Sequence, residues 1–202
     1  PHFNKLFYQS TDKVVCISKV THEILKRVAK DVESEYLPHA VDSEFFKKFK
    51  SEEGVNSIKG MRQNLLNSTD AKHFNKDKKI FFWNNRNARR KQSGTLIWWF
   101  KEFLDEVGHD KACLLMHTDA RDPHGQDLPH LIEHLGVGDG QVFLSTNKVA
   151  PQDLAAMYNA ADFTLNISDA EGFGLATLES MACGTPIIVT MTGGLQEQVT
   201  DG

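Results

Sequence analysis

The chain has 202 residues, a length that suits one large domain or one domain and part of another. Lysine and arginine total 23 against 27 aspartate and glutamate, a net charge of -4, whereas domains whose main partner is nucleic acid are usually basic. Apolar residues make up 40% of the chain and charged residues 25%, which excludes the disordered class.

The three cysteines, Cys16, Cys113 and Cys183, each lie in an apolar run, and no C-x-x-C occurs. We interpret them as buried, reduced thiols rather than zinc ligands. No apolar stretch approaches the ~20 residues that cross a bilayer, and the first residues lack the pattern of a signal peptide. We therefore expect a cytoplasmic protein and leave contact with a membrane surface open. Because the chain starts at Pro1 and stops just after an expected helix, we also expect it to be part of a longer protein.

The first part of the chain has the pattern of one strand–helix–strand unit. An apolar run at 13–18 predicts a buried strand, 20–32 an amphipathic helix and 34–41 a second strand. Residues 43–78 are polar, charged and weakly periodic, and we interpret them as an interdomain linker with one or two short helices. The first domain is thus predicted at 1–42.

A second domain is predicted at 79–202, where strands and helices alternate clearly. The predicted strands are 79–84, 112–118, 141–145, 162–168 and 186–190, and the helices between them are 93–107, 128–135, 151–160 and 174–183. This alternation predicts an α/β fold: a parallel, Rossmann-like sheet with helices on both faces. Ligands of such sheets bind at the carboxyl ends of the strands, so the loops that follow the strands are the candidate sites.

The segment EGFGLATLE, from Glu171 to Glu179, follows one expected strand and begins a helix. Its glycines permit a tight turn and the close approach of a ligand, and the free amides at the start of the helix favour an anion. The carboxylates of Glu171 and Glu179 suit hydroxyl groups on either side of that anion. The pattern indicates a central diphosphate with a sugar at each end, although a capping acidic loop and a solvated helix glutamate would fit it equally well.

The loop NNRNARRKQ at 84–92 carries four basic side chains, Arg86, Arg89, Arg90 and Lys91, in a chain that is acidic overall. It follows the first strand of the second domain, so the fold brings it to the same sheet edge as the loop at Glu171. Cations opposite a helix N-terminus can neutralise a diphosphate from two sides. Alone, such a run is more often a solvated basic turn.

From about Thr11 to Gly202 the chain resembles the nucleotide-sugar glycosyltransferases of family 4, the group 1 glycosyl transferases, which have the GT-B fold of two Rossmann-like domains. YLPHAVD is similar to the family's crossing segment, and FFWNNRNARRK to its loop with an arginine and a lysine five residues apart. EGFGLATLESMACGTPIIVT and TGGLQEQVTDG follow the family's donor half in order. The usual pattern is not followed at five positions, which leaves the subfamily open: Ala40, Trp83, Asn84, Asn85 and Ile167.

The resemblance implies a role for each matching position. It makes 79–202 the donor-binding half, and 1–42 the end of the acceptor domain. Arg86 and Lys91 would hold the diphosphate of a nucleotide-sugar donor and Glu171 would contact its sugar, so these three form the catalytic set. Glu179 would bind the ribose hydroxyls, and the backbone amides of Phe173, Gly174 and Leu175 would reach the phosphate.

The resemblance also implies retention of anomeric configuration and no metal or other cofactor at the donor. The acceptor, whether glycan, lipid or small molecule, stays open, as does a homodimer. Because most of the acceptor domain is missing, we expect this chain alone to be inactive. Two alternatives follow: a nucleotide-diphosphate binding module without turnover, and a zinc hydrolase using the H-x-x-E-H motif at His130, Glu133 and His134.

Overall fold

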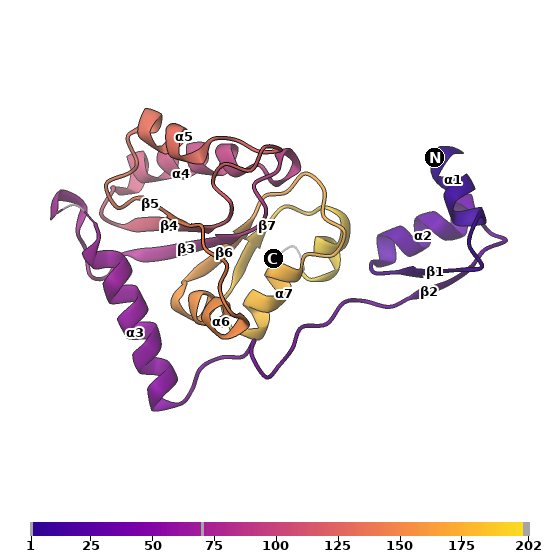
Figure 1. Ribbon diagram of the computed structural model, residues 1–202, viewed down its shortest axis with the longest axis horizontal. Helices are drawn as coiled ribbons and strands as arrows, with labels where there is room; N and C mark the ends of the chain where they lie inside the picture. Colours follow the sequence, from indigo (N-terminus) through magenta and orange to yellow (C-terminus); the bar gives the residue numbers. More distant parts are fainter. Residues whose placement is uncertain (1, 70, 200–202) are drawn as a thin grey trace.

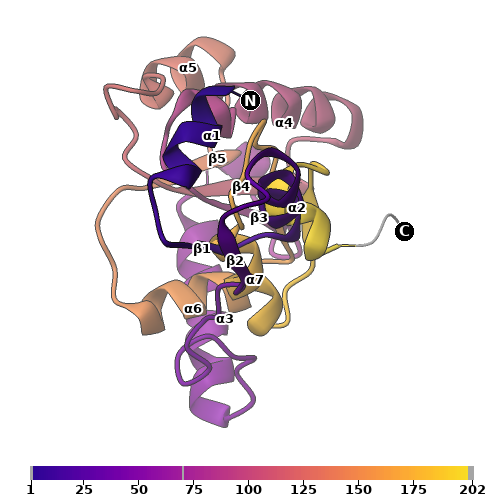
Figure 2. The same ribbon diagram turned by 90° about the vertical axis from the view of Figure 1, so that its right-hand side faces the viewer.

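The computed structural model describes residues 2–69 and 71–199, which form two parallel sheets (Figure 1). The smaller unit contains α1 (His2–Gln9), β1 (Lys13–Cys16), α2 (Lys19–Val28) and β2 (Glu33–Tyr36). β1 and β2 pair in parallel and are covered by α2. Leu25 of α2 and Ala29, which caps its C-terminus, are buried against Cys16. Figure 2 views the molecule from the side of this unit.

The second predicted strand ends earlier than expected, at Tyr36 rather than residue 41. Leu37 still donates a hydrogen bond from its N–H to the carbonyl of Cys16, but the next residue, Pro38, has no N–H to donate. Residues 37–42 therefore continue as irregular chain. The helix α1 was not predicted.

The larger sheet has the order β5-β4-β3-β6-β7, with every neighbouring pair parallel. Its elements, in chain order, are β3 (Lys79–Asn84), α4 (Ser93–Val107), β4 (Ala112–His117), α5 (Leu128–Leu135), β5 (Val142–Ser145), α6 (Pro151–Ala160), β6 (Phe163–Asn166), α7 (Leu175–Ala182) and β7 (Ile187–Val189). This part of the chain also contains three short 3-10 helices: η1 (Ala71–His73), η2 (Arg89–Lys91) and η3 (Gly193–Glu197). The predicted α/β fold class is thus confirmed.

Alternate residues of the central strands pack into separate cores on the two faces of the sheet, as the two-residue repeat of a strand requires. Trp83 and Leu114 pack with α4 and α5 on one face, whereas Phe82 and Leu115 pack with α6 on the other. Both cores are apolar because helices cover both faces, which are the upper and lower faces in Figure 1.

The segment predicted as a linker contains the 16-residue helix α3 (Glu52–Asn67), which packs against α6. The Arg62 guanidinium donates hydrogen bonds to the Asp162 carboxylate at 3.0 Å and to the Lys78 carbonyl at 3.2 Å. This helix therefore covers the larger sheet instead of only joining two domains. The domain limits themselves stay a prediction.

Replacing Arg62 by alanine should lower the free energy of unfolding by about 2–3 kcal/mol, because charged hydrogen bonds of ~1.5–3 kcal/mol each are lost and Asp162 is left paired with the exposed Lys79. Chemical denaturation measures the change. Lys59→Ala, an exposed position on the same helix, is the control and should change stability by less than about 0.5 kcal/mol. Equal stability of the two variants would contradict this role of Arg62.

Candidate functional site

The order of the strands reverses between β3 and β6, because the chain passes from β3 towards β5 on one side and from β6 to β7 on the other. The loops after these two strands diverge there and leave a crevice at their carboxyl ends. A cleft of about 350 Å³ lies at this point. Its lining includes Asn85 and Arg90 from the first loop, and 171–174 from the second loop with 175–176 from the start of α7. Ile17 and His39 come from the smaller unit.

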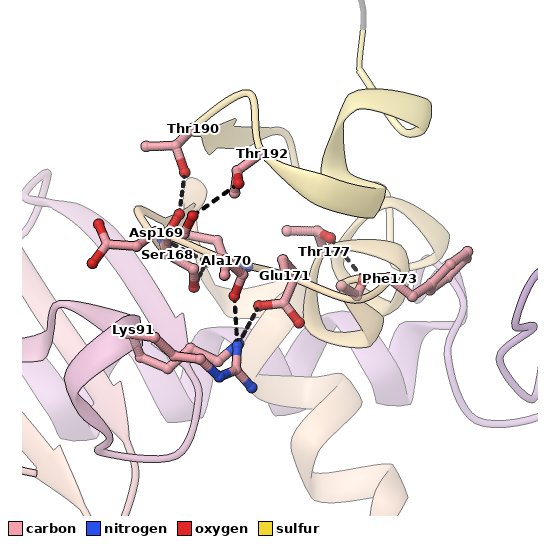
Figure 3. Close-up of polar contacts among 12 residues, drawn as sticks. Lys91, Ser168, Asp169, Ala170, Glu171, Phe173, Thr177, Thr190 and Thr192 are labelled. Carbon is pink, nitrogen blue, oxygen red and sulfur yellow. Dashed lines mark hydrogen bonds and ion pairs between the residues drawn. The ribbon is translucent and has the colours of Figure 1, made fainter. Parts of the chain in front are cut away.

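Donors from neighbouring segments hold the carbonyl groups of the loop at 168–171 (Figure 3). The Thr190 hydroxyl donates to the Ser168 carbonyl at 2.8 Å, and the Thr192 hydroxyl to that of Asp169 at 2.9 Å. The Arg90 guanidinium donates to the Ala170 carbonyl at 2.6 Å, and the Gly194 N–H to that of Glu171 at 3.0 Å. With its carbonyls fixed in this way, the loop is held in one conformation.

The same support continues into the first turn of α7. The Gln198 side-chain amide donates to the carbonyls of Phe173 at 2.6 Å and Gly174 at 3.1 Å, and the Thr177 hydroxyl donates to the Gly174 carbonyl at 2.7 Å. Gly174 has a φ of +95°, which favours glycine. Because the opening amides of a helix have no partner within it, those at the start of α7 are placed to bind an anion in the cleft.

η3 brings two glycines directly against the backbone of this loop. A Cβ at Gly193 would lie 1.9 Å from the Glu171 carbonyl oxygen, and one at Gly194 would lie 2.5 Å from that of Gly172. Real Cβ atoms are never so close to a backbone atom, so any side chain here would move the loop.

Lys91 is buried, and its ammonium group pairs with the Glu171 carboxylate. Burial lowers the pKa of Lys91, because a charge loses its hydration, while the hydrogen bond that Lys91 donates to Glu171 opposes this change. Arg90 adds a second cation 3.5 Å from the same carboxylate. A lysine and an arginine thus share one carboxylate beside the opening amides of α7.

Arg86 lies on the same loop but is held elsewhere. Its guanidinium pairs with both carboxylate oxygens of Asp122, at 2.6 and 3.2 Å. This pairing lowers the pKa of Asp122 to about 2 and raises that of Arg86. The arginine that lines the cleft is instead Arg90, which the residue pattern did not favour over Arg86 or Arg89.

The remaining predicted residues lie around α7. The Phe173 ring is buried and meets His39 edge-on, with 5.3 Å between centroids, while Leu175 is exposed at the cleft. Glu179, one turn further along, accepts a hydrogen bond from the buried Tyr158 hydroxyl at 2.7 Å. Burial raises the pKa of Glu179, and the Tyr158 hydrogen bond partly offsets this. Sequence reasoning did not single out Tyr158.

The zinc alternative gains no support from the geometry. Within 2–69 and 71–199, no group of three or more His, Cys, Asp or Glu side chains could hold a metal ion, so His130, Glu133 and His134 have no further ligand. The helices of this part of the chain are also too short or too polar for any of them to cross a membrane.

Comparisons with known proteins identify the family. Residues 67–202 match the family model described as "Glycosyl transferases group 1", so the chain belongs to this family, as the resemblance implied. It is 27% identical over 195 residues to an alpha-monoglucosyldiacylglycerol synthase of Streptococcus pneumoniae. This alignment covers 96% of this chain and 41% of the relative. A stretch of 76 residues, 38% of this chain and 18% of the relative, is 40% identical to a D-inositol 3-phosphate glycosyltransferase of Paenarthrobacter aurescens.

Two solved structures share the fold over 98% of this chain. One is a sucrose-phosphate synthase from Thermosynechococcus elongatus, with a TM-score of 0.74 and 26% identity over 45% of that chain. The other is Anabaena Alr3699/HepE in complex with UDP and glucose, with a TM-score of 0.74 and 18% identity over 49% of that chain. The chain thus spans less than half the length of these relatives.

The close contact between η3 and the loop at Glu171 can be tested by comparing two glycine-to-alanine substitutions, one at the contact and one at an open position. Gly193→Ala should lower the free energy of unfolding by more than about 2 kcal/mol, because its Cβ would overlap the Glu171 carbonyl. Gly60→Ala, on α3 with no atom within 4 Å of the new Cβ, should stabilise the chain by up to ~1 kcal/mol. Thermal unfolding distinguishes the two. A Gly193→Ala variant as stable as the parent would refute the close contact.

The Arg86–Asp122 pair predicts a pH dependence. A carboxyl whose pKa falls on folding adds stability above its unfolded pKa of 3.8 and loses this contribution as the pH falls towards 2. The Asp122 carboxyl carbon, followed by NMR, should therefore titrate at about pH 2. In Arg86→Gln the midpoint should rise towards 3.8, and an unchanged midpoint would show that another group controls this carboxyl.

Proposed function

We propose that this chain is the donor-binding half of a retaining glycosyltransferase and that the cleft at β3 and β6 binds a nucleotide-diphosphate sugar. The observation that carries the proposal is the meeting of Lys91, Arg90 and the opening amides of α7 around one carboxylate, Glu171. Membership of the group 1 glycosyltransferases supports it, as does the fold shared with a protein whose structure contains UDP and glucose.

The geometry suggests how the donor would bind. The diphosphate would take the place of Glu171 as the anionic partner of Lys91 and Arg90, with the α7 amides on its other side. Glu171, released from the cations, would accept hydrogen bonds from hydroxyls of the transferred sugar. Glu179 is held through one oxygen, Oε2, by Tyr158, so Oε1 would accept from the ribose.

The same groups would act on the leaving group. As the bond to the sugar breaks, negative charge grows on the diphosphate, and cations and amides already in position stabilise it without reorganisation. Under this proposal the configuration at the sugar is retained and the donor needs no metal. The contribution of Arg86 and the cytoplasmic location stay predictions.

Transfer itself is proposed to require the rest of the acceptor domain, because the chain covers less than half of its relatives. The alternative, a binding module that never turns over, makes a different prediction. Joining the missing domain to this chain should give sugar transfer to an acceptor in the first case and binding alone in the second.

Calorimetric titration of this chain with UDP, GDP and ADP tests the donor site. One nucleotide should bind saturably, and Lys91→Ala should weaken its binding about tenfold or more, since a charged hydrogen bond contributes ~1.5–3 kcal/mol. The titration should give the same result in the presence of a metal chelator. Lys101→Ala, on the outer side of α4, is the control and should leave affinity unchanged.

Arg90 and Arg86 can be separated in the same experiment. Arg90→Ala should weaken binding several-fold, because this side chain lines the cleft, whereas Asp122 already holds Arg86. An equal loss in Arg86→Ala would restore the role that the resemblance implies for it. Full affinity in Lys91→Ala would reject the proposed diphosphate contact, and binding of none of the three nucleotides would reject the donor site.

A further inference from the structure

Two side-chain amides at the cleft have buried nitrogens without a hydrogen-bond partner. They are Asn85 Nδ2, just after β3, and Asn166 Nδ2, on the last residue of β6. Only a few side-chain atoms in the described parts of the chain, before and after residue 70, share this property, and these two both belong to residues that line the cleft. A buried polar group left without a partner costs about 1–3 kcal/mol, so two at one site call for an explanation.

The orientation of the Asn166 amide follows from its neighbours. Its oxygen, Oδ1, accepts hydrogen bonds from the Ser168 N–H at 3.2 Å and from the Ser168 hydroxyl at 2.5 Å. Turning the amide over would set its NH₂ group against the Ser168 N–H, which is also a donor. The NH₂ group must therefore face away from Ser168, so the unpaired group of Asn166, a residue that lines the cleft and is only 1% exposed, is a donor and not an acceptor.

The two amides lie at the ends of the two strands between which the sheet order reverses: Asn166 is the last residue of β6, and Asn85 directly follows β3. β3 and β6 are hydrogen-bonded neighbours, so Asn85 and Asn166 flank the point from which the loops diverge. The cleft above them also contains Arg90 and the opening amides of α7, which are donors, and the Glu171 carboxylate, which is an acceptor. A sugar hydroxyl can satisfy either kind of group, but a phosphate oxygen bears lone pairs alone and matches a cluster of donors.

We propose that Asn85 and Asn166 donate hydrogen bonds to the terminal phosphate of the bound nucleoside diphosphate and so select a diphosphate over a monophosphate. The proposal rests on the proposed function of the cleft and adds two residues to it. The roles that the family resemblance implies include neither amide. Asn85 stands at a position where this chain departs from the family pattern, so the contact would be a feature of this protein and of relatives that share its asparagine.

Asn166→Asp tests the proposal with the least change of shape. The remaining oxygen still accepts from Ser168, while an oxygen replaces the donor that faces the cleft. Affinity for the nucleoside diphosphate should fall at least about tenfold, because a charged acceptor then faces the phosphate, and affinity for the matching monophosphate should change less than about twofold. Asn85→Ala, at a less buried position, should cost the diphosphate about three- to tenfold in affinity and gives the answer even if Asn166→Asp disturbs folding.

Gln141→Met provides the matched control. Gln141 is also a buried amide with an unpaired atom, Oε1. It directly precedes β5 and so lies at the amino-terminal end of a strand, whereas the cleft lies at the carboxyl ends. Its replacement should leave both affinities unchanged. Melting curves of all variants confirm that each is folded at the temperature of titration.

Each outcome decides the proposal. If the parent chain binds a diphosphate and both asparagine variants bind it equally well, the role of the amides is overturned while the donor site stands. A loss confined to the nucleotide-sugar, with the free diphosphate unaffected, would place the amides on the sugar and also overturn it. Equal losses for monophosphate and diphosphate would show a structural effect and overturn the selectivity. A parent chain that binds no nucleotide overturns the proposed function itself, and this inference with it.

Discussion

The loop between β6 and α7 is held through its carbonyl groups, and the rest of the cleft depends on this constraint. Hydroxyls from the segment after β7, an arginine from the loop after β3 and a backbone amide from η3 each take one carbonyl of residues 168–171. Gln198 holds the carbonyls of Phe173 and Gly174 in the same way. A hydrogen bond at its oxygen hinders the rotation of a peptide group, so the amides at the start of α7 keep their direction without help from a ligand. An anion can then bind without paying for the ordering of the loop.

The pairing of Lys91 with Glu171 follows from the same geometry. A buried ammonium group needs an anionic neighbour, because burial without one strongly disfavours its charged form. In this structure Glu171 is that neighbour, and the fixed loop places its carboxylate against Lys91. The same requirement would be met by a diphosphate, so the burial that makes Lys91 need an anionic partner also suits the site to a nucleotide. Arg90 shares this arrangement because its guanidinium contacts both the Glu171 carboxylate and the neighbouring Ala170 carbonyl.

Much of the larger sheet could be predicted because its signals are local, whereas contacts between distant segments could not. The bounds expected for β3, α4, α5 and α6 agree with the structure, since apolar periodicity and end residues such as Asp127 and Gly136 mark them in the sequence. The partner of Arg62 on α3, by contrast, lies a hundred residues further along the chain. At the site, the directions of the adjacent basic residues depend on η2 and on Asp122, which comes from another loop. Sequence spacing therefore locates the cationic loop but does not identify the arginine that faces the cleft.

One short segment, η3, contacts both the loop that lines the cleft and the smaller unit of the chain. η3 places Gly194 under the Glu171 carbonyl, while Glu197, three residues on, accepts hydrogen bonds from the Lys19 N–H at 2.5 Å and the Tyr36 hydroxyl at 2.9 Å. The carboxylate of Glu197 thus lies at the N-terminus of α2, where the helix dipole favours it. Because His39 of the smaller unit also meets Phe173, the wall of the cleft contains residues from both units. A change in the position of the smaller unit would therefore act on the backbone that supports Glu171 as well as on the opening of the cleft.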